Sequence, residues 1–109
     1  MKKFSCAFNG LKEALKEKAV LTQCVLALLA ILGGLIIKLD HYEWLAFIIC
    51  IALVIGFEII NSVIEKLCDL YSLDKNENIR IIKDMAASAV LVVSIGALLV
   101  CILCLIRRI

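Results

Sequence analysis

Residues 19–37 read Ala-Val-Leu-Thr-Gln-Cys-Val-Leu-Ala-Leu-Leu-Ala-Ile-Leu-Gly-Gly-Leu-Ile-Ile, and only Thr22 and Gln23 in this run are polar. A helix rises about 1.5 Å per residue, so a run of about nineteen residues can cross a hydrocarbon core about 30 Å thick. This run therefore predicts a transmembrane helix. Gly33 and Gly34 favour close contact with another helix, because neither carries a side chain.

Two further apolar runs follow. Residues 44–57 are uninterrupted apolar sequence but too short to cross a bilayer, so the second helix must continue through polar residues to about residue 64. Residues 85–106 form a third run, long enough to cross on its own. The sequence predicts transmembrane helices at 19–37, 44–64 and 85–106, with a polar cytoplasmic loop at 65–84.

The segment before the first run, residues 1–18, is amphipathic. Its apolar side chains recur at helical spacing, as Phe4, Phe8, Leu11 and Leu15, and lysines cover much of the remaining surface. The pattern predicts a helix at the membrane surface, with its apolar stripe toward the acyl chains and its basic face toward anionic head groups. A coiled-coil or core helix is the alternative interpretation.

The composition fits a single membrane-embedded domain, residues 1–109. The chain is 64% hydrophobic, well above the usage of soluble domains, and its formal charge is only +2. This near-neutral balance disfavours a nucleic-acid-binding protein. The six cysteines are expected to pack as small apolar side chains, because most of them lie inside apolar runs.

The lysines and arginines predict the orientation. Residues 1–18 hold five of them and residues 65–84 hold four, whereas the turn between the first two spans holds only Lys38. Cytoplasmic segments carry such an excess, so the N-terminus and residues 65–84 are expected in the cytoplasm. Arg107 and Arg108 then follow the third span on the outer side, against the same rule.

A polar ridge runs along the second span and beyond it. It consists of Glu58, Asn61, Ser62, Glu65 and Asp69. At about 100° of rotation per residue these side chains project within about 100° of one another. A carboxylate near the hydrocarbon costs roughly 2.5 to 3.5 kcal/mol, so the ridge requires partners, protonation or water. A functional site is the prediction, and hydrogen bonding between helices without chemistry is the alternative.

The residues of the ridge and its surroundings suit different chemical roles, depending on their depth in the membrane. Glu65 and Asp69 offer the oxygen ligands that Mg²⁺ takes together with phosphate oxygens. Glu58 lies deeper and is a candidate general base for a hydroxyl. Lys83, just before the third span, is either a phosphate ligand or an ordinary cation at the membrane edge. The glycines form neither a Walker A loop nor a kinase glycine-rich loop, so a nucleotide site would be of another type.

Two segments carry a family resemblance. Residues 58–69, Glu-Ile-Ile-Asn-Ser-Val-Ile-Glu-Lys-Leu-Cys-Asp, resemble the signature Glu-x-x-Asn-Ser/Thr-x-Ile-Glu-x-x-x-Asp of prokaryotic diacylglycerol kinases, which are small membrane enzymes with three spans. Residues 82–90, Ile-Lys-Asp-Met-Ala-Ala-Ser-Ala-Val, are similar to the family's Ala-Lys-Asp-x-Ala-Ala-Gly-Ala-Val block. The resemblance extends over essentially the whole chain.

The resemblance implies transfer of the γ-phosphoryl group of ATP to a lipid hydroxyl, with Mg²⁺, in a homotrimer of helical bundles with active sites shared between subunits. It implies Glu58 as the catalytic base and Glu17 and Glu65 as metal ligands, with Glu13 as the alternative to Glu17. Both metal ligands would also contact the nucleotide. The other residues implied in or around the nucleotide site are Asn61, Asp69, Lys83 and Asp84. Ser88, which replaces the family's glycine, is expected beside the lipid with Glu58.

The acceptor and the class of protein have alternatives. Diacylglycerol, which would become phosphatidic acid in phospholipid biosynthesis, is the expected acceptor, and undecaprenol is the alternative because the family contains both activities. A small proton-coupled multidrug transporter has a similar length and a membrane glutamate, although such transporters need four spans. A structural trimer with the ridge as its contact is a third interpretation. The kinase interpretation places the chain in the bacterial inner membrane as a multi-pass protein.

Overall fold

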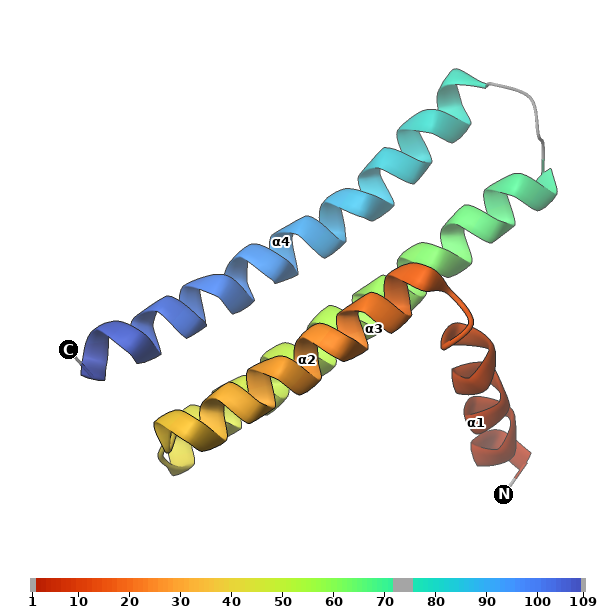
Figure 1. Ribbon diagram of the computed structural model, residues 1–109. Helices are drawn as coiled ribbons and strands as arrows, with labels where there is room; N and C mark the ends of the chain where they lie inside the picture. Colours follow the sequence, from red (N-terminus) through yellow and green to blue (C-terminus); the bar gives the residue numbers. More distant parts are fainter. Residues whose placement is uncertain (1, 72–75, 109) are drawn as a thin grey trace.

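The computed structural model describes residues 2–71 and 76–108, and within them the chain is entirely helical apart from short connections. The helices are α1 (Lys2–Ala14), α2 (Lys18–Ile37), α3 (His41–Tyr71) and α4 (Glu77–Arg108) (Figure 1). Three of them, α2, α3 and α4, are long and apolar enough to cross a membrane. The predicted all-α fold with three candidate spans is confirmed.

The central helix is α3. It packs against both α2 and α4, so α3 holds the other two spans together. Figure 1 shows α2 running along one half of α3, whereas α1 turns away from this pair instead of extending α2. The polar ridge therefore lies on the helix that contacts both other spans.

A residue in the left-handed backbone conformation ends α2. Lys38 adopts φ 65°, and its backbone N–H donates to Gly34 O at 2.9 Å, while Leu39 N donates to the same oxygen at 3.1 Å. A Cβ on Gly34 would lie 2.8 Å from Leu39 Cδ1 and 3.0 Å from the tip of Trp44. The predicted close approach therefore occurs at Gly34. It does not occur at Gly33, where a Cβ would have no described atom within 4 Å beyond its own stretch of helix.

A reciprocal capping box starts α3. Glu43 N donates to Asp40 Oδ1 at 2.9 Å, and Asp40 N donates to Glu43 Oε1 at 3.0 Å. Trp44 N then donates to Asp40 O at 3.0 Å as the first bond of the helix ladder. The helix consequently begins at His41, before the apolar run at Trp44 that marked the predicted second span.

The segment predicted as a cytoplasmic loop, residues 65–84, is mostly helical. Helix α3 continues to Tyr71 and α4 already begins at Glu77, while residues 72–75 lie outside the described residues. The loop prediction is wrong there, because polarity alone does not distinguish a solvated helix from a loop. The segment has neither glycine nor proline in its helical parts, and charged residues at helical spacing support a solvated helix.

The amphipathic N-terminal segment forms a shorter helix than predicted. Helix α1 ends at Ala14, and Glu17 is the residue that precedes α2. Phe4 and Phe8 on α1 are exposed. The predicted position of this helix at the membrane surface stays a prediction.

The described residues bury little apolar surface. The buried apolar residues are Ala14, Val20, Leu39, Cys68 and Ile79. The buried polar or charged residues are Glu43, Glu58, Asn61 and Ser62. The spans thus hide polar side chains and expose apolar ones, the reverse of a soluble domain, as expected when lipid surrounds the helices. All six cysteines are free.

Candidate functional site

The ridge passes from the buried middle of α3 to its exposed end. Glu58 is only 7% exposed, and Asn61 and Ser62 beside it are also buried. Glu65 and Asp69, further along the same helix, are exposed. One helix face thus joins an enclosed carboxylate to carboxylates that are open to the solvent.

Glu58 has a polar partner on the first span. Gln23 Nε2 on α2 donates a hydrogen bond to Glu58 Oε2 at 3.5 Å, a long contact that holds the two groups together only weakly. Sequence reasoning did not assign Gln23 to the site. A signal was present, because Gln23 is one of two polar residues in the run 19–37 and Glu58 interrupts the next apolar run.

Asn61 carries an unused acceptor. Its Nδ2 donates to Glu65 Oε1 at 3.2 Å, which orients both side chains along the ridge. Its Oδ1 is buried and has no hydrogen-bond partner among the described residues. An unpaired buried acceptor costs about 1–3 kcal/mol, so this oxygen is suited to a hydroxyl donor or a cation.

The exposed end of the ridge contacts α4. Lys83 Nζ lies 2.8 Å from Asp69 Oδ1, and the Asp69 hydrogen bond and charge raise the pKa of Lys83, which precedes the apolar run 85–106. The adjacent Asp84 points elsewhere, because Arg80 Nη1 lies 2.9 Å from Asp84 Oδ2. The structure therefore joins Lys83 to the ridge and gives Asp84 a partner on its own helix.

Glu17 reaches α3 through a lysine. Lys66 Nζ lies 2.5 Å from Glu17 Oε1, and this ion pair ties the start of α2 to the residue that follows Glu65. A cavity of about 230 Å³ lies beside the pair, between α1 and α3, and the buried Ser62 lines it. Glu13, the alternative to Glu17, also lines this cavity, but it forms an ion pair with Lys16, just beyond the end of α1, at 3.1 Å.

The acidic residues of one chain do not gather into a metal-binding cluster. Within residues 2–71 and 76–108, no group of three His, Cys, Asp or Glu side chains lies close enough to hold a metal ion. The contacts of Glu17 and Glu65 are separate, with Lys66 and Asn61 respectively. Ser88 donates to the Met85 carbonyl at 2.6 Å within its own helix.

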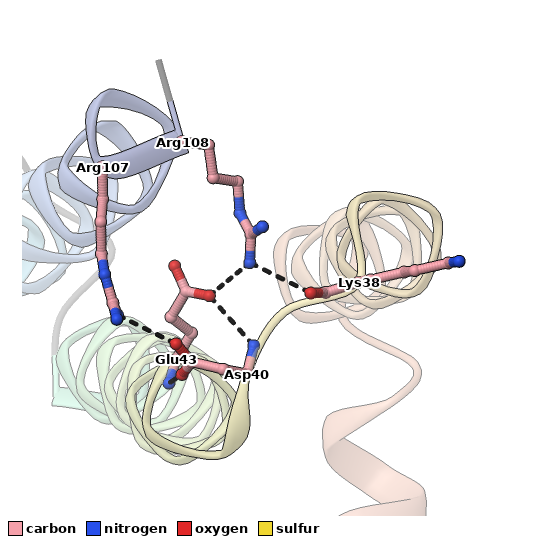
Figure 2. Close-up of polar contacts among 5 residues, drawn as sticks. All are labelled: Lys38, Asp40, Glu43, Arg107 and Arg108. Carbon is pink, nitrogen blue, oxygen red and sulfur yellow. Dashed lines mark hydrogen bonds and ion pairs between the residues drawn. The ribbon is translucent and has the colours of Figure 1, made fainter.

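A second polar cluster lies at the opposite end of α3, where Figure 2 shows two arginines of α4 reaching the turn between α2 and α3. Arg108 forms an ion pair with Glu43, which is only 5% exposed, and donates to Lys38 O at 3.1 Å. Arg107 Nη1 lies 3.0 Å from Asp40 Oδ2. Both arginines that oppose the charge rule thus have acidic partners, which sequence reasoning missed.

This outer cluster also affects Asp40. The backbone N–H of Glu43 is the main cause that lowers the pKa of Asp40, and the nearby Arg107 adds to it. The cluster closes the end of the bundle, because it joins the last turn of α4 to the α2–α3 turn. It is far along α3 from the ridge and is separate from the candidate site.

Three apolar helices with one buried polar ridge, leading to carboxylates and lysines at one end of the bundle, define a small all-α membrane protein with a polar site. A family model described as prokaryotic diacylglycerol kinase matches residues 5–105, nearly the whole chain. The chain therefore belongs to the prokaryotic diacylglycerol kinase family, and it is a lipid kinase of that family. A comparison with curated proteins finds no match. The family favours the kinase over the transporter interpretation.

Proposed function

We propose that the protein transfers the γ-phosphoryl group of ATP to the hydroxyl of diacylglycerol, in a reaction that requires Mg²⁺ and yields phosphatidic acid. The observation that carries the proposal is the ridge on α3, where the buried Glu58 stands on the same face as the exposed Glu65 and Asp69. Such a face suits both substrates, because the lipid hydroxyl approaches its buried part from the membrane and the nucleotide approaches its exposed part from water. Family membership supports the same reaction.

Glu58 is the proposed general base. It accepts the hydroxyl proton as the lipid oxygen forms a bond to the γ-phosphorus, and the bond from that phosphorus to the bridging oxygen breaks to release ADP. Phosphoryl transfer depends mainly on positioning and on neutralising charge, so a small site can perform it. Gln23 supports Glu58 from α2 by its hydrogen bond.

The donor set fits Mg²⁺. Glu17 and Glu65 are the residues that would hold it, and both offer hard carboxylate oxygens. The unpaired Oδ1 of Asn61 is a further oxygen donor beside Glu65. The carboxylate of Glu17 already holds a cation, the ammonium of Lys66. When bound, Mg²⁺ would neutralise phosphate oxygens of the nucleotide.

The nucleotide is proposed to lie at the exposed end of the ridge, against Asn61, Asp69, Lys83 and Asp84 together with the metal ligands. Lys83 supports this placement, because its contact with Asp69 keeps an ammonium group next to the ridge. Ser88 is the proposed contact with the lipid near Glu58. It lies one turn or more into α4 from Lys83, toward the apolar part of the helix.

A homotrimer with shared sites is part of the proposal. One chain keeps Glu17 and Glu65 in separate contacts, and its spans expose most of their apolar side chains, as a chain that packs against copies of itself does. ATP is cytoplasmic, so the exposed end of the ridge belongs on the cytoplasmic side of the bacterial inner membrane. The N-terminus lies on that side too, since Glu17 contacts Lys66.

Purified protein in mixed micelles, with γ-labelled ATP and Mg²⁺, tests the reaction. Diacylglycerol and undecaprenol are offered separately, and label is expected in phosphatidic acid. Label in undecaprenyl phosphate alone would overturn the acceptor, and label in neither lipid would overturn the kinase activity.

The role of Glu58 is tested in the same assay. Glu58→Gln is expected to lower turnover about 10²- to 10⁴-fold while the helical circular dichroism stays unchanged. Glu77→Gln removes an exposed carboxylate from α4 and is the matched control, with turnover near that of the wild type. Near-normal turnover of Glu58→Gln in a folded protein would exclude Glu58 as the base.

A further inference from the structure

Lys66 lies in the candidate site but has no role in the proposed reaction so far. It directly follows Glu65 on α3, and its Nζ lies 2.5 Å from Glu17 Oε1 at the start of α2. The Lys66 side chain is 63% exposed. It is therefore held by one contact and is otherwise free to move.

The ammonium of Lys66 occupies a place that a metal ion on Glu17 would need. Mg²⁺ binds carboxylate oxygens at about 2.0–2.1 Å, and a second cation on the same carboxylate would be repelled. Glu17 Oε1 cannot hold the ammonium and a metal ion at the same time, so the ammonium leaves that oxygen when a metal ion takes it. A lysine has a long flexible stem, so its head group can move several ångströms while α3 stays in place.

A polyanionic nucleotide gives the released ammonium a new partner. Glu58, Glu65 and Asp69 make the ridge acidic, and a nucleotide beside them needs cations to offset the repulsion. Lys83 is a second such cation, because its ammonium is also held by a carboxylate, that of Asp69. Lys66 and Lys83 thus flank the exposed half of the ridge, each on a carboxylate partner.

We propose that Lys66 is a further nucleotide-binding residue, which rests on the proposed kinase function. Without nucleotide it holds Glu17 as a substitute cation, and with metal-bound nucleotide it exchanges Glu17 for the phosphate oxygens. The metal and the ammonium therefore compete for Glu17 in the free protein and cooperate in the nucleotide complex. No bond other than these ionic contacts forms or breaks.

Mn²⁺ binding to the nucleotide-free protein tests the competition without any turnover. Electron paramagnetic resonance in detergent would compare the wild type with Lys66→Met, and an affinity about two- to fivefold higher is expected in the variant, since an exposed ion pair no longer competes. The gain should vanish in the Glu17→Gln background. Lys12→Met, which removes an exposed lysine from α1, should bind Mn²⁺ as the wild type does.

A nonhydrolysable ATP analogue with Mg²⁺ tests the second half. Lys66→Met is expected to bind it about tenfold more weakly, because a charge-assisted contact is lost, whereas Lys66→Arg should stay within about threefold of the wild type. Thermal unfolding of each variant shows that it is folded.

The outcomes separate this inference from the function on which it rests. Unchanged Mn²⁺ affinity in Lys66→Met, a gain that persists in Glu17→Gln, or unchanged affinity for the analogue would each overturn the role of Lys66. If the wild type itself labels no lipid, the proposed function fails instead. The Mn²⁺ comparison still decides in that case whether Lys66 competes for Glu17.

Discussion

Lys83 and Asp69 join α4 to α3 at the end of the ridge, with 2.8 Å between Nζ and Oδ1 across 14 positions of sequence. Both side chains are substantially exposed, so this contact adds little to stability. Its proposed importance lies in the ammonium group that it positions.

Lys83→Met is accordingly expected to raise the KM for ATP about tenfold or more, because a charged contact to phosphate is lost. The thermal unfolding midpoint should barely change, and Lys83→Arg should keep most of the affinity. Steady-state titration with ATP and thermal unfolding in the same detergent measure both. A lower unfolding midpoint with an unchanged KM would instead make Lys83 a structural brace.

Gly34 and Gly33 provide a matched pair for the end of α2. Gly34→Ala would place a methyl group 2.8 Å from Leu39 Cδ1 and 3.0 Å from Trp44, so the turn must shift. A loss of about 1–3 kcal/mol is expected, as for an overpacked site. Gly33→Ala meets no described atom within 4 Å beyond its own stretch of helix and should be neutral or slightly stabilising. Unfolding by a denaturing detergent compares them, and equal losses would contradict the contact at Gly34.

Arg108 and Arg107 differ in the burial of their acidic partners. Arg108→Met leaves the buried carboxylate of Glu43 without its cation, whereas Arg107→Met releases the more exposed Asp40. The unfolding midpoint of Arg108→Met should therefore fall several degrees further than that of Arg107→Met. Adding Glu43→Gln to Arg108→Met should recover part of the loss. The same midpoint for both arginine variants would show that partner burial does not matter here.

Asp40 predicts a pH dependence at the outer turn. Its pKa lies below the ordinary 3.8, so the folded state favours the charged carboxylate. The stabilisation is fully present above about pH 3.8 and is lost as the pH falls through the lower, folded-state pKa. Asp40→Asn should be less stable than the wild type at pH 6, and the difference should shrink below pH about 4. A difference that is constant from pH 6 to pH 3 would contradict this contribution.

Apolar periodicity made the membrane fold predictable. The runs 19–37 and 85–106 lie within α2 and α4, and the burial of Glu58 and Asn61 agrees with a ridge turned away from lipid. These features depend on local sequence alone, because a long apolar run has few alternatives to a helix in a bilayer.

The missed features depend on pairings between distant residues. Arg108 meets Glu43 only because α4 packs along α3, and Lys66 meets Glu17 only because the start of α2 lies against α3. The sequence around Arg108 or Lys66 does not indicate which distant acidic residue will be its partner. The loop at 65–84 failed for another reason: Arg80 pairs with Glu77 and Asp84 along one helix, so charge there supports the helix.

Because the spans are exposed, the free energy of unfolding of this protein depends on what surrounds the single chain. No residue in the most apolar stretch of α4 is fully buried within the single chain, so part of its environment is supplied from outside. The free energy of unfolding is then a joint property of chain and surroundings, and it must be stated with the amphiphile and the protein concentration. A detergent that coats the helices while keeping chains apart can preserve every helix and still abolish the shared site proposed between neighbouring chains.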